Sequence, residues 1–427
     1  MLKQLQLKNT GPIPNLDIEF ADRINLLTGD NGLGKSFIMD IAWWALTRKW
    51  PQEVNSKLTC GYMARPTDPK KDAEIIIKVK GKIKTPTETS VSFNRNKQSW
   101  IFPQAKPTMP GLVIYAQPNG GFAVWDPARN YSEEHSGAGH DRQPAYIFDP
   151  QEVWDGLKKK DDKPVCNGLV SDWSGWQKEN GSAFEHLCKV LKALSPSENE
   201  NIVPGKLTRV SLDDARDIPT IKMPYGIEVP VIYASAGMKR IISLAYLLVW
   251  AWAEHVKSCD LLGIKTTKQL IMLIDEIEAH LHPKWQRTIS SALLSVVNSL
   301  KKELKVQLII ATHSPLVMAS LEPTFDAKKD AWFDIDIEQN KVVLISREFE
   351  KHGDATNWLT SEAFDLKSTR SIESAKLTEE ASALIQLEIP DKTKVKAIYE
   401  KLVLALSPKD DFLFVWRSIC QKRELLK

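Results

Sequence analysis

Residues 24–40 read INLLTGDNGLGKSFIMD, and this stretch indicates the fold of the chain around it. An apolar run at 24–28 is typical of a buried strand, a glycine-rich turn follows, and the apolar residues after the turn recur at helical spacing. The turn matches the pattern G-x-x-x-x-G-K-[ST] at Gly29, Gly34, Lys35 and Ser36. A strand, a glycine turn and a helix in this order predict an α/β fold with a nucleotide phosphate site.

Each residue type in the turn has a chemical reason to be there. Glycines let consecutive backbone N–H groups curl around a phosphate, and the N-terminus of the following helix points at the same anion. Lys35 can reach the β- and γ-phosphates, and the Ser36 hydroxyl can bind Mg²⁺. We therefore expect ATP and Mg²⁺ as ligands, since a bare tight turn would not need Lys-Ser at the start of its helix.

The composition is typical of a soluble globular protein of the cytoplasm. Of 427 residues, 26% are charged and 43% hydrophobic, and the net charge of +3 is too small to indicate a nucleic-acid partner by itself. The five cysteines form no C-x-x-C pair, which indicates reduced thiols rather than disulfides or a zinc site. The N-terminus lacks the apolar stretch of a signal peptide, and no apolar run reaches membrane length.

Strand patterns dominate the first third of the chain. Two precede the glycine turn, at 2–8 and 16–20, and a run of six follows it with Gly, Pro and Asn at the turns. This run predicts an antiparallel sheet or meander, with strands at 74–80, 82–84, 90–94, 100–102, 111–117 and 122–125. Farther on we expect a helix at 182–194, strands at 207–212 and 229–234, a hairpin at 332–346 turning at Gln339-Asn340, and a helical tail from about residue 357.

Residues 48–97 are locally basic. They contain 12 Lys or Arg against 5 Asp or Glu. A solvated sheet face explains this excess, and a DNA-facing surface is the functional alternative.

Three further pieces follow the glycine turn in order. Ser235 and Gly237 stand at the start of a strongly apolar helix, where backbone N–H groups could face a phosphate. Asp275-Glu276 ends the apolar strand LIMLI, so Asp275 could hold Mg²⁺ and Glu276 could deprotonate an attacking water. His313 ends the buried strand VQLIIAT and could sense the γ-phosphate. Read alone, each has a structural explanation: a helix cap, a solvated strand end and a packed histidine.

Together these pieces resemble the ABC-type ATPase head shared by RecF, SMC proteins and OLD nucleases. GDNGLGKS is similar to their Walker A motif, SAGMKR to a degenerate ABC signature, LIDEIEAHLHP to Walker B with its D-loop, and ATHSP to the switch-histidine strand. The resemblance covers essentially the whole chain. It implies an α/β ABC-type head with a mixed or antiparallel N-terminal sheet lobe, a parallel core sheet flanked by helices, and no coiled-coil arm. It assigns nucleotide contacts to Gly29, Asn31, Gly32, Gly34, Lys35, Ser36, Ser235 and Gly237, Mg²⁺ to Ser36 and Asp275, and catalysis to Glu276 and His313.

The resemblance also implies how two copies work together. Two heads would meet head to tail, so that Ser235 and Gly237 of one copy complete the ATP site of the other, in a homodimer or a higher oligomer. ATP binding would close this dimer and hydrolysis would reopen it. His280 and His282 would then lie near the opposite site, although plain packing explains them equally well.

The Q-loop glutamine of such heads stays open in this sequence. Order along the chain favours Gln177, with Gln117 and Gln151 as rivals and Asp172 as a possible substitute.

Several relatives are disfavoured by the spacing. An importer or exporter head usually carries a different D-loop from EIEAHLHP. SMC-type proteins need hundreds of heptad residues between P-loop and signature, whereas about 200 residues of mostly strand and loop lie between Ser36 and Ser235 here. An OLD-like nuclease domain is also disfavoured, because only 114 residues follow His313 and the pair Asp334 and Asp336 falls in a hairpin strand.

The segment 353–376 is similar to a stretch of ATPase subunits in Septu, retron and PARIS antiphage systems, and this implies a role. We expect an ATPase that senses or scaffolds in antiphage defence and controls a separately encoded nuclease, of HNH or Toprim type. A RecF-like DNA-binding repair ATPase is the alternative, and a self-contained nuclease is a third hypothesis.

The expected domains follow from the same resemblance. An ATPase head at 1–350 would contain a P-loop and sheet lobe at 1–180, a helical and linker insertion at 181–228 and a signature, Walker B and switch lobe at 229–350. A helical segment would follow at 351–427.

Overall fold

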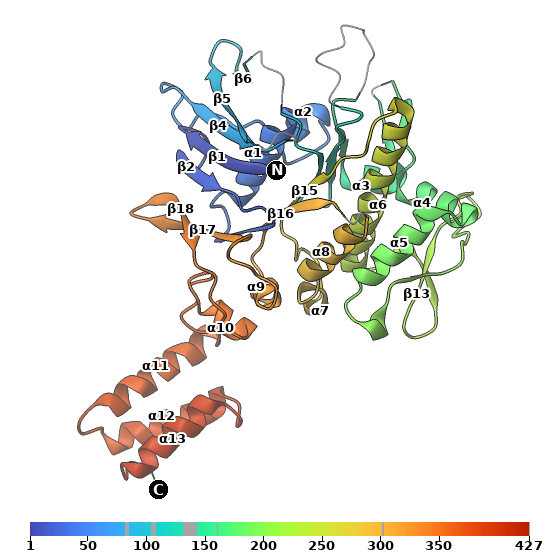
Figure 1. Cartoon of the computed structure of the whole chain (residues 1–427). Coiled ribbons are helices and arrows are strands. Elements are labelled where there is room, and N and C mark those ends of the chain that lie inside the picture. The colour runs from blue at the N-terminus through green and yellow to red at the C-terminus, as the bar shows by residue number, and fades with distance from the viewer. Residues whose placement is uncertain (82–84, 104–107, 131–142, 160, 301–302, 427) are drawn as a thin grey trace. The chain divides into compact units, whose positions relative to one another are not determined.

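The computed structural model describes residues 1–81, 85–103, 108–130, 143–159, 161–300 and 303–426 (Figure 1). It divides into two compact units, Met1–Ala355 and Thr356–Lys427. Each unit has its own hydrophobic core, and the first has the expected α/β fold.

The N-terminal sheet is antiparallel and has the strand order β2-β1-β4-β5-β6. Its sequence alternates as a half-buried sheet should: in β4 every second residue is fully buried and the others are half-exposed. The strand expected at 82–84 lies outside the described residues. The strands are β1 (Leu2–Lys8), β2 (Asn15–Glu19), β4 (Glu74–Val79), β5 (Thr87–Asn94) and β6 (Ser99–Ile101).

The central sheet has eight strands in the order β18-β17-β3-β16-β15-β7-β8-β9. Its five middle members, from β17 to β7, run parallel to one another, and β18, β8 and β9 are antiparallel additions at the edges. The parallel strands are β3 (Ile24–Gly29), β7 (Leu112–Ala116), β15 (Gln269–Ile274), β16 (Lys305–Ala311) and β17 (Ala331–Glu338), and the others are β8 (Phe122–Trp125), β9 (Tyr146–Phe148) and β18 (Lys341–Arg347). The hairpin of β17 and β18 is confirmed, with positive φ angles of 50° and 62° at Gln339 and Asn340.

The single antiparallel meander expected between 74 and 125 is wrong in its second half. The structure gives β4 to β6 to the N-terminal sheet and moves β7 and β8 into the central one, where β7 pairs in parallel with β15. The physical reason is burial on both faces: all five residues of β7 and all four of β8 are buried, as in the middle of a layered α/β fold.

Helix α1 (Lys35–Thr47) lies between the two sheets (Figure 1). It is apolar almost all round, and its side chains share one core with β1 and β4 on one side and with β3, β15 and β16 on the other. Helix α6 (Ala236–Leu262) contacts the same central sheet, where Trp250 meets Tyr146 and Phe148 edge-on at 5.4 and 5.5 Å between ring centroids.

The chain from 150 to 235 forms a small mixed lobe beside α6. The helix expected at 182–194 is confirmed as α5, but the strand expected at 207–212 is wrong, because the segment forms one isolated bridge, Thr208 with Ile218. The second expected strand is only partly present, as β14 followed by a single 3-10 turn, Val231–Tyr233. The lobe contains α3 (Pro150–Asp155), β10 (Leu157–Lys158), β11 (Pro164–Cys166), α4 (Gly168–Glu179), α5 (Ser182–Ala193), the 3-10 turn Glu198–Glu200, β12 (Val203–Pro204), β13 (Thr220–Lys222) and β14 (Glu228–Pro230).

Short helices complete the connections, with α10 at the boundary of the two units, and three longer helices follow it in the second unit. Trp416 anchors that unit, because its ring is buried and its indole N–H donates to the Ala381 carbonyl at 2.8 Å. The connecting helices are α2 (Pro51–Val54), α7 (Pro283–Gln286), α9 (Pro315–Leu321) and α10 (Ala355–Leu359), α8 (Ile289–Leu300) follows α7, and the second unit holds α11 (Ile372–Gln386), α12 (Lys392–Ala405) and α13 (Asp411–Lys422).

The longest helix among the described residues is α6, with 27 residues, and most of it is buried. No coiled-coil arm therefore leaves the described part of the head, as expected. No helix in the described ranges is long and apolar enough to cross a membrane.

Candidate functional site

The glycine turn between β3 and α1 has the backbone of a phosphate-binding loop. Gly29, Gly32 and Gly34 all have positive φ, at 127°, 82° and 104°. Gly29 also meets β17, because a Cβ on it would lie 2.2 Å from the Ile335 carbonyl oxygen. Any larger residue there would push β17 away from β3, so this glycine serves the sheet as well as the loop. Asn31 and Gly32 are exposed at the tip of the turn.

Lys35 begins α1 and curls back over the loop. Its side chain is buried, and its Nζ donates to the carbonyl oxygens of Gly29 at 2.7 Å and Asp30 at 2.8 Å. Burial lowers the pKa of Lys35, while the charges of Asp275 and Asp30 act in the opposite direction. A phosphate in the loop would offer the ammonium a charged acceptor in place of two neutral carbonyls.

Asp275 follows β15 and is the most enclosed carboxylate of the site. It is 0% exposed, its N–H donates to the Ala116 carbonyl at 3.0 Å, and neither carboxylate oxygen accepts a well-formed hydrogen bond from a described residue. Burial raises its pKa to about 6, and Ser36 beside it counteracts part of that shift. A buried carboxylate with two free oxygens next to a serine hydroxyl fits a hard cation such as Mg²⁺.

Glu276 has an unusual backbone. Its φ is 50°, in the left-handed region that glutamate rarely adopts. The turn aims its half-buried side chain where its charge acts on Lys35 and His313. This placement suits a base held opposite the Lys35 ammonium.

His313 follows β16, and its half-buried ring faces the same charges. Burial lowers its pKa and Lys35 lowers it further, while Glu276 and Asp30 act in the opposite direction. The lowered pKa favours the neutral imidazole, whose ring N–H can donate a hydrogen bond to a phosphate oxygen.

Glu278 is a site residue that the sequence reasoning missed. Its carboxylate accepts hydrogen bonds from the His313 backbone N–H and, at 2.7 Å, from the Thr312 hydroxyl. Burial raises its pKa, and these hydrogen bonds oppose the shift. Glu278 thus ties the end of β16 to the loop after Asp275, and the second glutamate of the sequence DEIE was the available signal.

The structure reverses the preference for Gln177 as the Q-loop glutamine. Gln177 lies in α4, where it accepts from the Trp173 indole at 3.1 Å and donates to the Gly205 carbonyl at 2.8 Å. Gln117 instead follows β7, directly after the carbonyl that binds the Asp275 N–H, and both of its buried amide atoms lack a partner. A buried amide without partners beside Asp275 is a better candidate for a metal or water ligand.

The other two candidates for that role are occupied elsewhere. Gln151 is exposed in α3, where its amide donates to Asp155 at 3.3 Å. Asp172 accepts from the Tyr246 hydroxyl at 2.8 Å and from Asn167 at 2.9 Å.

Ser235 and Gly237 form the start of α6. The exposed Ser235 caps the helix, since its hydroxyl accepts from the Met238 N–H at 3.4 Å. Gly237 is buried, and a Cβ on it would lie 2.6 Å from the His280 carbonyl oxygen, so it must be small for α6 to pack on the loop after Glu276. His280 is exposed and His282 caps α7, its Nδ1 accepting from the Lys284 N–H at 3.3 Å. No described contact brings Ser235 to the glycine loop of its own chain.

The aspartates of the hairpin are not arranged as a metal site. Asp334 is buried and accepts from the Thr28 hydroxyl at 2.8 Å, and it pairs with Arg347 at 3.2 Å. Within the described ranges no group of three or more His, Cys, Asp or Glu side chains could hold a metal ion.

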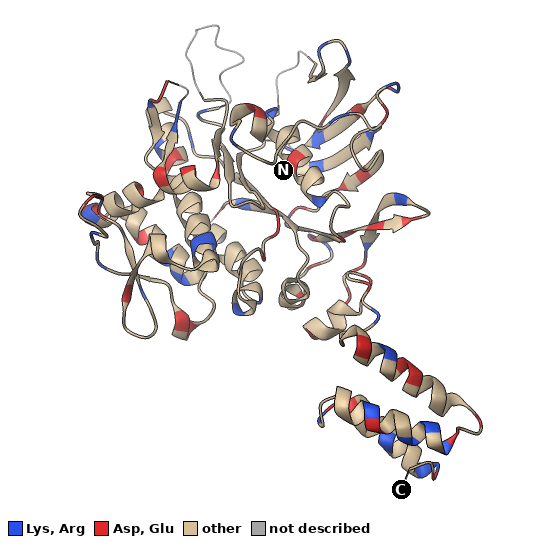
Figure 2. Ribbon diagram, turned by 180° about the vertical axis from the view of Figure 1, so that it is seen from behind, with Lys and Arg blue, Asp and Glu red and all other residues tan. Residues whose placement is uncertain are grey.

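The basic stretch 48–97 is partly neutralised by ion pairs. Acidic and basic residues stand next to each other on the N-terminal sheet (Figure 2). Four of its basic residues are paired: Lys57 with Glu152 at 2.7 Å, Lys71 with Asp68 at 3.6 Å, Lys78 with Glu88 at 3.1 Å and Arg95 with Asp72 at 3.0 Å. This pattern favours a solvated face, and DNA binding there stays a prediction.

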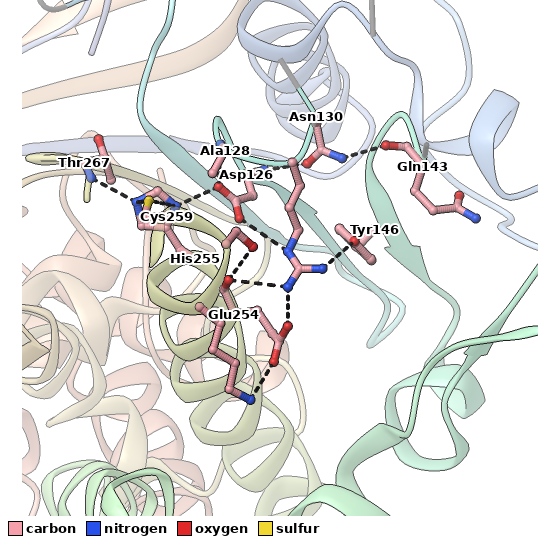
Figure 3. Close-up of polar contacts among 12 residues, drawn as sticks. Asp126, Ala128, Asn130, Gln143, Tyr146, Glu254, His255, Cys259 and Thr267 are labelled. Carbon is pink, nitrogen blue, oxygen red and sulfur yellow. Dashed lines mark hydrogen bonds and ion pairs between the residues drawn. The ribbon is translucent and has the colours of Figure 1, made fainter. Parts of the chain in front are cut away.

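A separate buried polar cluster closes the far half of α6 onto the end of β8 (Figure 3). The Nε2 of His255 accepts from the Thr267 N–H at 2.9 Å, so its Nδ1–H donates to Asp126 at 2.7 Å. Cys259 lies 3.5 Å from the same Nε2. Both ring nitrogens are engaged and the thiol is buried, so this cysteine, histidine and aspartate hold structure together rather than perform catalysis.

Family comparisons agree with this geometry. One model, described as "AAA domain, putative AbiEii toxin, Type IV TA system", matches residues 123–319, and a second, described as "AAA domain", matches residues 4–160. The match at 4–160 contains the glycine loop, and the match at 123–319 contains Ser235, Asp275 and His313.

Two retron probable ATPases and a Septu protein are similar to part of this chain. The retron Vc95 probable ATPase of Vibrio cholerae is 28% identical over 171 residues, which are 39% of this chain and 30% of that protein. The Septu protein PtuA of Bacillus mycoides is 35% identical over 88 residues, and the retron Ec83 probable ATPase of Escherichia coli is 33% identical over 131 residues. The matched regions span 10% of PtuA and 20% of the Ec83 protein, so each relative has much that this chain does not match.

Among solved structures, the SMC head domain from Thermotoga maritima is similar at 15% identity, with a TM-score of 0.42. That alignment covers 81% of this chain and 99% of the SMC head.

Proposed function

We propose that the chain binds and hydrolyses ATP as a dimer of heads, because AAA-domain models match residues 4–160 and 123–319 and the chain is similar to two retron probable ATPases over part of its length. The observation that carries the proposal is Asp275, a buried carboxylate with no hydrogen-bond partner beside Lys35, Ser36 and Glu276. Such a group is costly to bury unless a cation completes it.

The roles of the residues follow from their positions. The glycine loop and Lys35 bind the phosphates, and Ser36 and Asp275 hold Mg²⁺, with Gln117 as a further oxygen ligand. Bound Mg²⁺ neutralises charge that develops on the phosphates during hydrolysis. Glu276 takes the proton of the attacking water, and the neutral His313 donates a hydrogen bond toward the γ-phosphate.

Dimerisation would complete the site. Ser235 is exposed at the N-terminus of a 27-residue helix, where N–H groups and the helix dipole favour an anion. The anion would be the ATP of a second head, bound in trans by Ser235 and Gly237.

Glu276→Gln tests the chemistry. The amide keeps the shape of the side chain but cannot accept the proton, so we expect kcat to fall by about 10²- to 10⁴-fold while ATP still binds. Stable ATP-dependent dimers should then be visible by light scattering. Glu338→Gln, on the exposed tip of the hairpin, removes the same charge and should hydrolyse ATP like the wild type.

Lys35→Ala should give a different defect. It removes the ammonium that faces the phosphates, so nucleotide binding itself should weaken and no ATP-dependent dimer should form.

For the Glu276→Gln variant, an unchanged turnover rate would show that a group other than Glu276 is the base.

The wider role is proposed from the antiphage relatives. The chain would act in the cytoplasm as a sensor or scaffold that restrains or delivers a separately encoded nuclease of HNH or Toprim type. Copurification of the chain with the product of a neighbouring nuclease gene tests this role. Binding of DNA with no protein partner, together with a repair defect on deletion, would instead favour a RecF-like repair ATPase.

A further inference from the structure

The second unit has a groove between its first two helices, α11 and α12. These helices run antiparallel, because the Ser374 hydroxyl near the start of α11 donates to the Ala405 carbonyl at the end of α12 at 3.5 Å. The groove has a volume of about 630 Å³. Side chains from both helices line it, among them Leu377 and Glu380 of α11 and Lys401 and Leu404 of α12.

Leu404 is the most exposed apolar side chain of this groove. It is 89% exposed, whereas Leu402 and Leu406 on the same helix are buried in the core of the unit. Helix α12 therefore has apolar residues in two directions, and the chain itself covers only one of them. Burying a leucine side chain releases free energy, so a surface that received Leu404 would gain from the contact.

The two walls of the groove belong to helices of opposite charge (Figure 2). Helix α11 has three glutamates and one lysine, a net charge of −2, and α12 has four lysines and one glutamate, a net charge of +3. None of these side chains is in an ion pair with another described residue, and the pair of Arg370 with Asp410 at 2.9 Å lies outside both helices. Both walls thus keep their charge available to a partner.

The antiparallel packing fixes which residues would meet if two grooves faced each other. Ser374 is level with Ala405, and a helix rises about 1.5 Å per residue, so Glu380 is level with a point less than one turn from Lys401. A two-fold axis parallel to the helices exchanges the two walls and keeps every height along them. Glu380 of each copy then lies across from Lys401 of the other, and Leu404 lies over Leu377. An axis perpendicular to the helices would instead set acidic α11 against acidic α11.

We propose that this groove is a contact between two copies of the chain and that it forms without nucleotide. Leu404 of each copy enters the groove of the other, and the pair of Glu380 with Lys401 forms twice. One acidic wall beside one basic wall is complementary to itself under a two-fold rotation, so a second copy supplies the matching surface directly. The contact uses no residue of the ATP site and is independent of the proposed dimer of heads. Because the contact is small, we expect an affinity in the micromolar range.

Sedimentation velocity of the full chain without nucleotide tests the contact. Over a micromolar concentration series the wild type should change from one chain to two. Leu404→Gln removes the apolar side chain from the groove and should weaken dimerisation by about tenfold or more, with an unchanged melting temperature because Leu404 lies outside the core. Val403→Gln is the matched control, since Val403 is an exposed neighbour that does not line the groove, and it should dimerise like the wild type.

Reversing the charges tests which helices face each other. Glu380→Lys and Lys401→Glu each place like charges across the contact twice, so each variant alone should dimerise about tenfold or more weakly than the wild type. An equimolar mixture of the two variants restores opposite charges at both positions and should form mixed dimers. Glu379→Lys makes the same charge change at an exposed neighbour outside the groove and should have little effect.

The outcomes separate this contact from the proposed function. A wild type that stays one chain at every concentration, or that dimerises only with ATP, would overturn the contact and leave the dimer of heads untouched. Dimers that are insensitive to Leu404→Gln, or a variant mixture no more dimeric than its two components, would also overturn it. A nucleotide-free dimer that responds to these variants, in a chain that hydrolyses no ATP, would leave the contact standing while the proposed function fails.

Discussion

Asp40 illustrates how strongly the surroundings of a carboxyl group change its pKa. It lies in α1 beneath the glycine loop and accepts a hydrogen bond of 2.9 Å from the Tyr115 hydroxyl. The pKa of Asp40 is raised to about 7, mainly by burial and in part by the charge of Asp275, while the hydrogen bonds from Tyr115 and Gly61 oppose the shift. Two carboxyl groups with raised pKa values, Asp40 and Asp275, therefore lie close together under the site.

The pH dependence of stability follows from the direction of these shifts. A carboxyl whose pKa is higher in the folded than in the unfolded state holds its proton more tightly when folded. Each such group costs stability as pH rises from about 4 toward its folded pKa, by up to about 1.4 kcal/mol per pH unit, and the cost levels off above it. For Asp40 the window ends near pH 7, and for Asp275 near pH 6.

Asp40→Asn removes this cost and keeps an oxygen for the Tyr115 hydroxyl. We expect the variant to be more stable than the wild type, with the difference growing by about 2–3 kcal/mol between pH 5 and pH 8. Urea unfolding of the nucleotide-free protein at both pH values measures it. A difference that stays constant between the two pH values would mean that Asp40 is already ionised at pH 5.

At the scale of the element, helix α6 carries a different group of polar residues at each of its two ends. Its first turns carry Ser235, Gly237 and Arg240, and its last turns carry His255 and Cys259. The first group has unpartnered donors, whereas the hydrogen bonds of His255 are satisfied on both ring nitrogens. We infer that the far half of the helix is a fixed anchor and that its N-terminal half is where changes can occur.

His255→Phe tests the anchor. The change leaves the Thr267 N–H without its acceptor and removes the His255 donor from Asp126, which keeps only the Ala128 N–H and the Arg129 charge, so unfolding should become easier by about 2–4 kcal/mol. His255→Gln retains one donor and one acceptor and should lose less. Urea unfolding gives both values, and ATP affinity measured on the folded variants should not change.

Sequence reasoning worked best where a local pattern fixes local geometry. The P-loop strand and helix, the hairpin turn at Gln339-Asn340 and helix α5 depend on neighbours in the chain. Gln117 and Gln177 could not be separated in this way, because the difference lies in which strand pairs with β15. The fully apolar sequence of β7, LVIYA, was the one available sign that it belongs to the central sheet. Glu278 was missed because its role depends on contacts between segments far apart in sequence.

At the scale of the molecule, the two units have separate cores. The core of the second unit consists of Ala381, Leu384, Val395, Leu402, Leu406, Trp416 and Cys420. Several large apolar side chains on it remain exposed, among them Ile389 at 91%, Leu404 at 89% and Phe414 at 75%.

Residues 356–427 should fold without the rest of the chain. A 72-residue unit of this kind is small but within the range that folds alone, with a stability of a few kcal/mol. Circular dichroism of the isolated segment should show a helical spectrum and a cooperative melt. Trp416→Ala should abolish the melt, because it removes the largest side chain of the core and the hydrogen bond to Ala381. A non-cooperative melt of the unmodified segment would mean that it needs the first unit.

The contact between the hairpin and the P-loop strand gives the protein an internal optical probe. The indole N–H of Trp332 donates to the Thr28 hydroxyl at 2.7 Å, and Thr28 immediately precedes Gly29 of the phosphate-binding loop. Indole emission responds to the polarity and hydrogen bonding around the ring, so a shift of the loop should change the fluorescence of this tryptophan. The difference between wild-type and Trp332→Phe spectra, recorded with and without nucleotide, would isolate that emission from the other 13 tryptophans. ATP binding could then be followed in real time without attaching a dye.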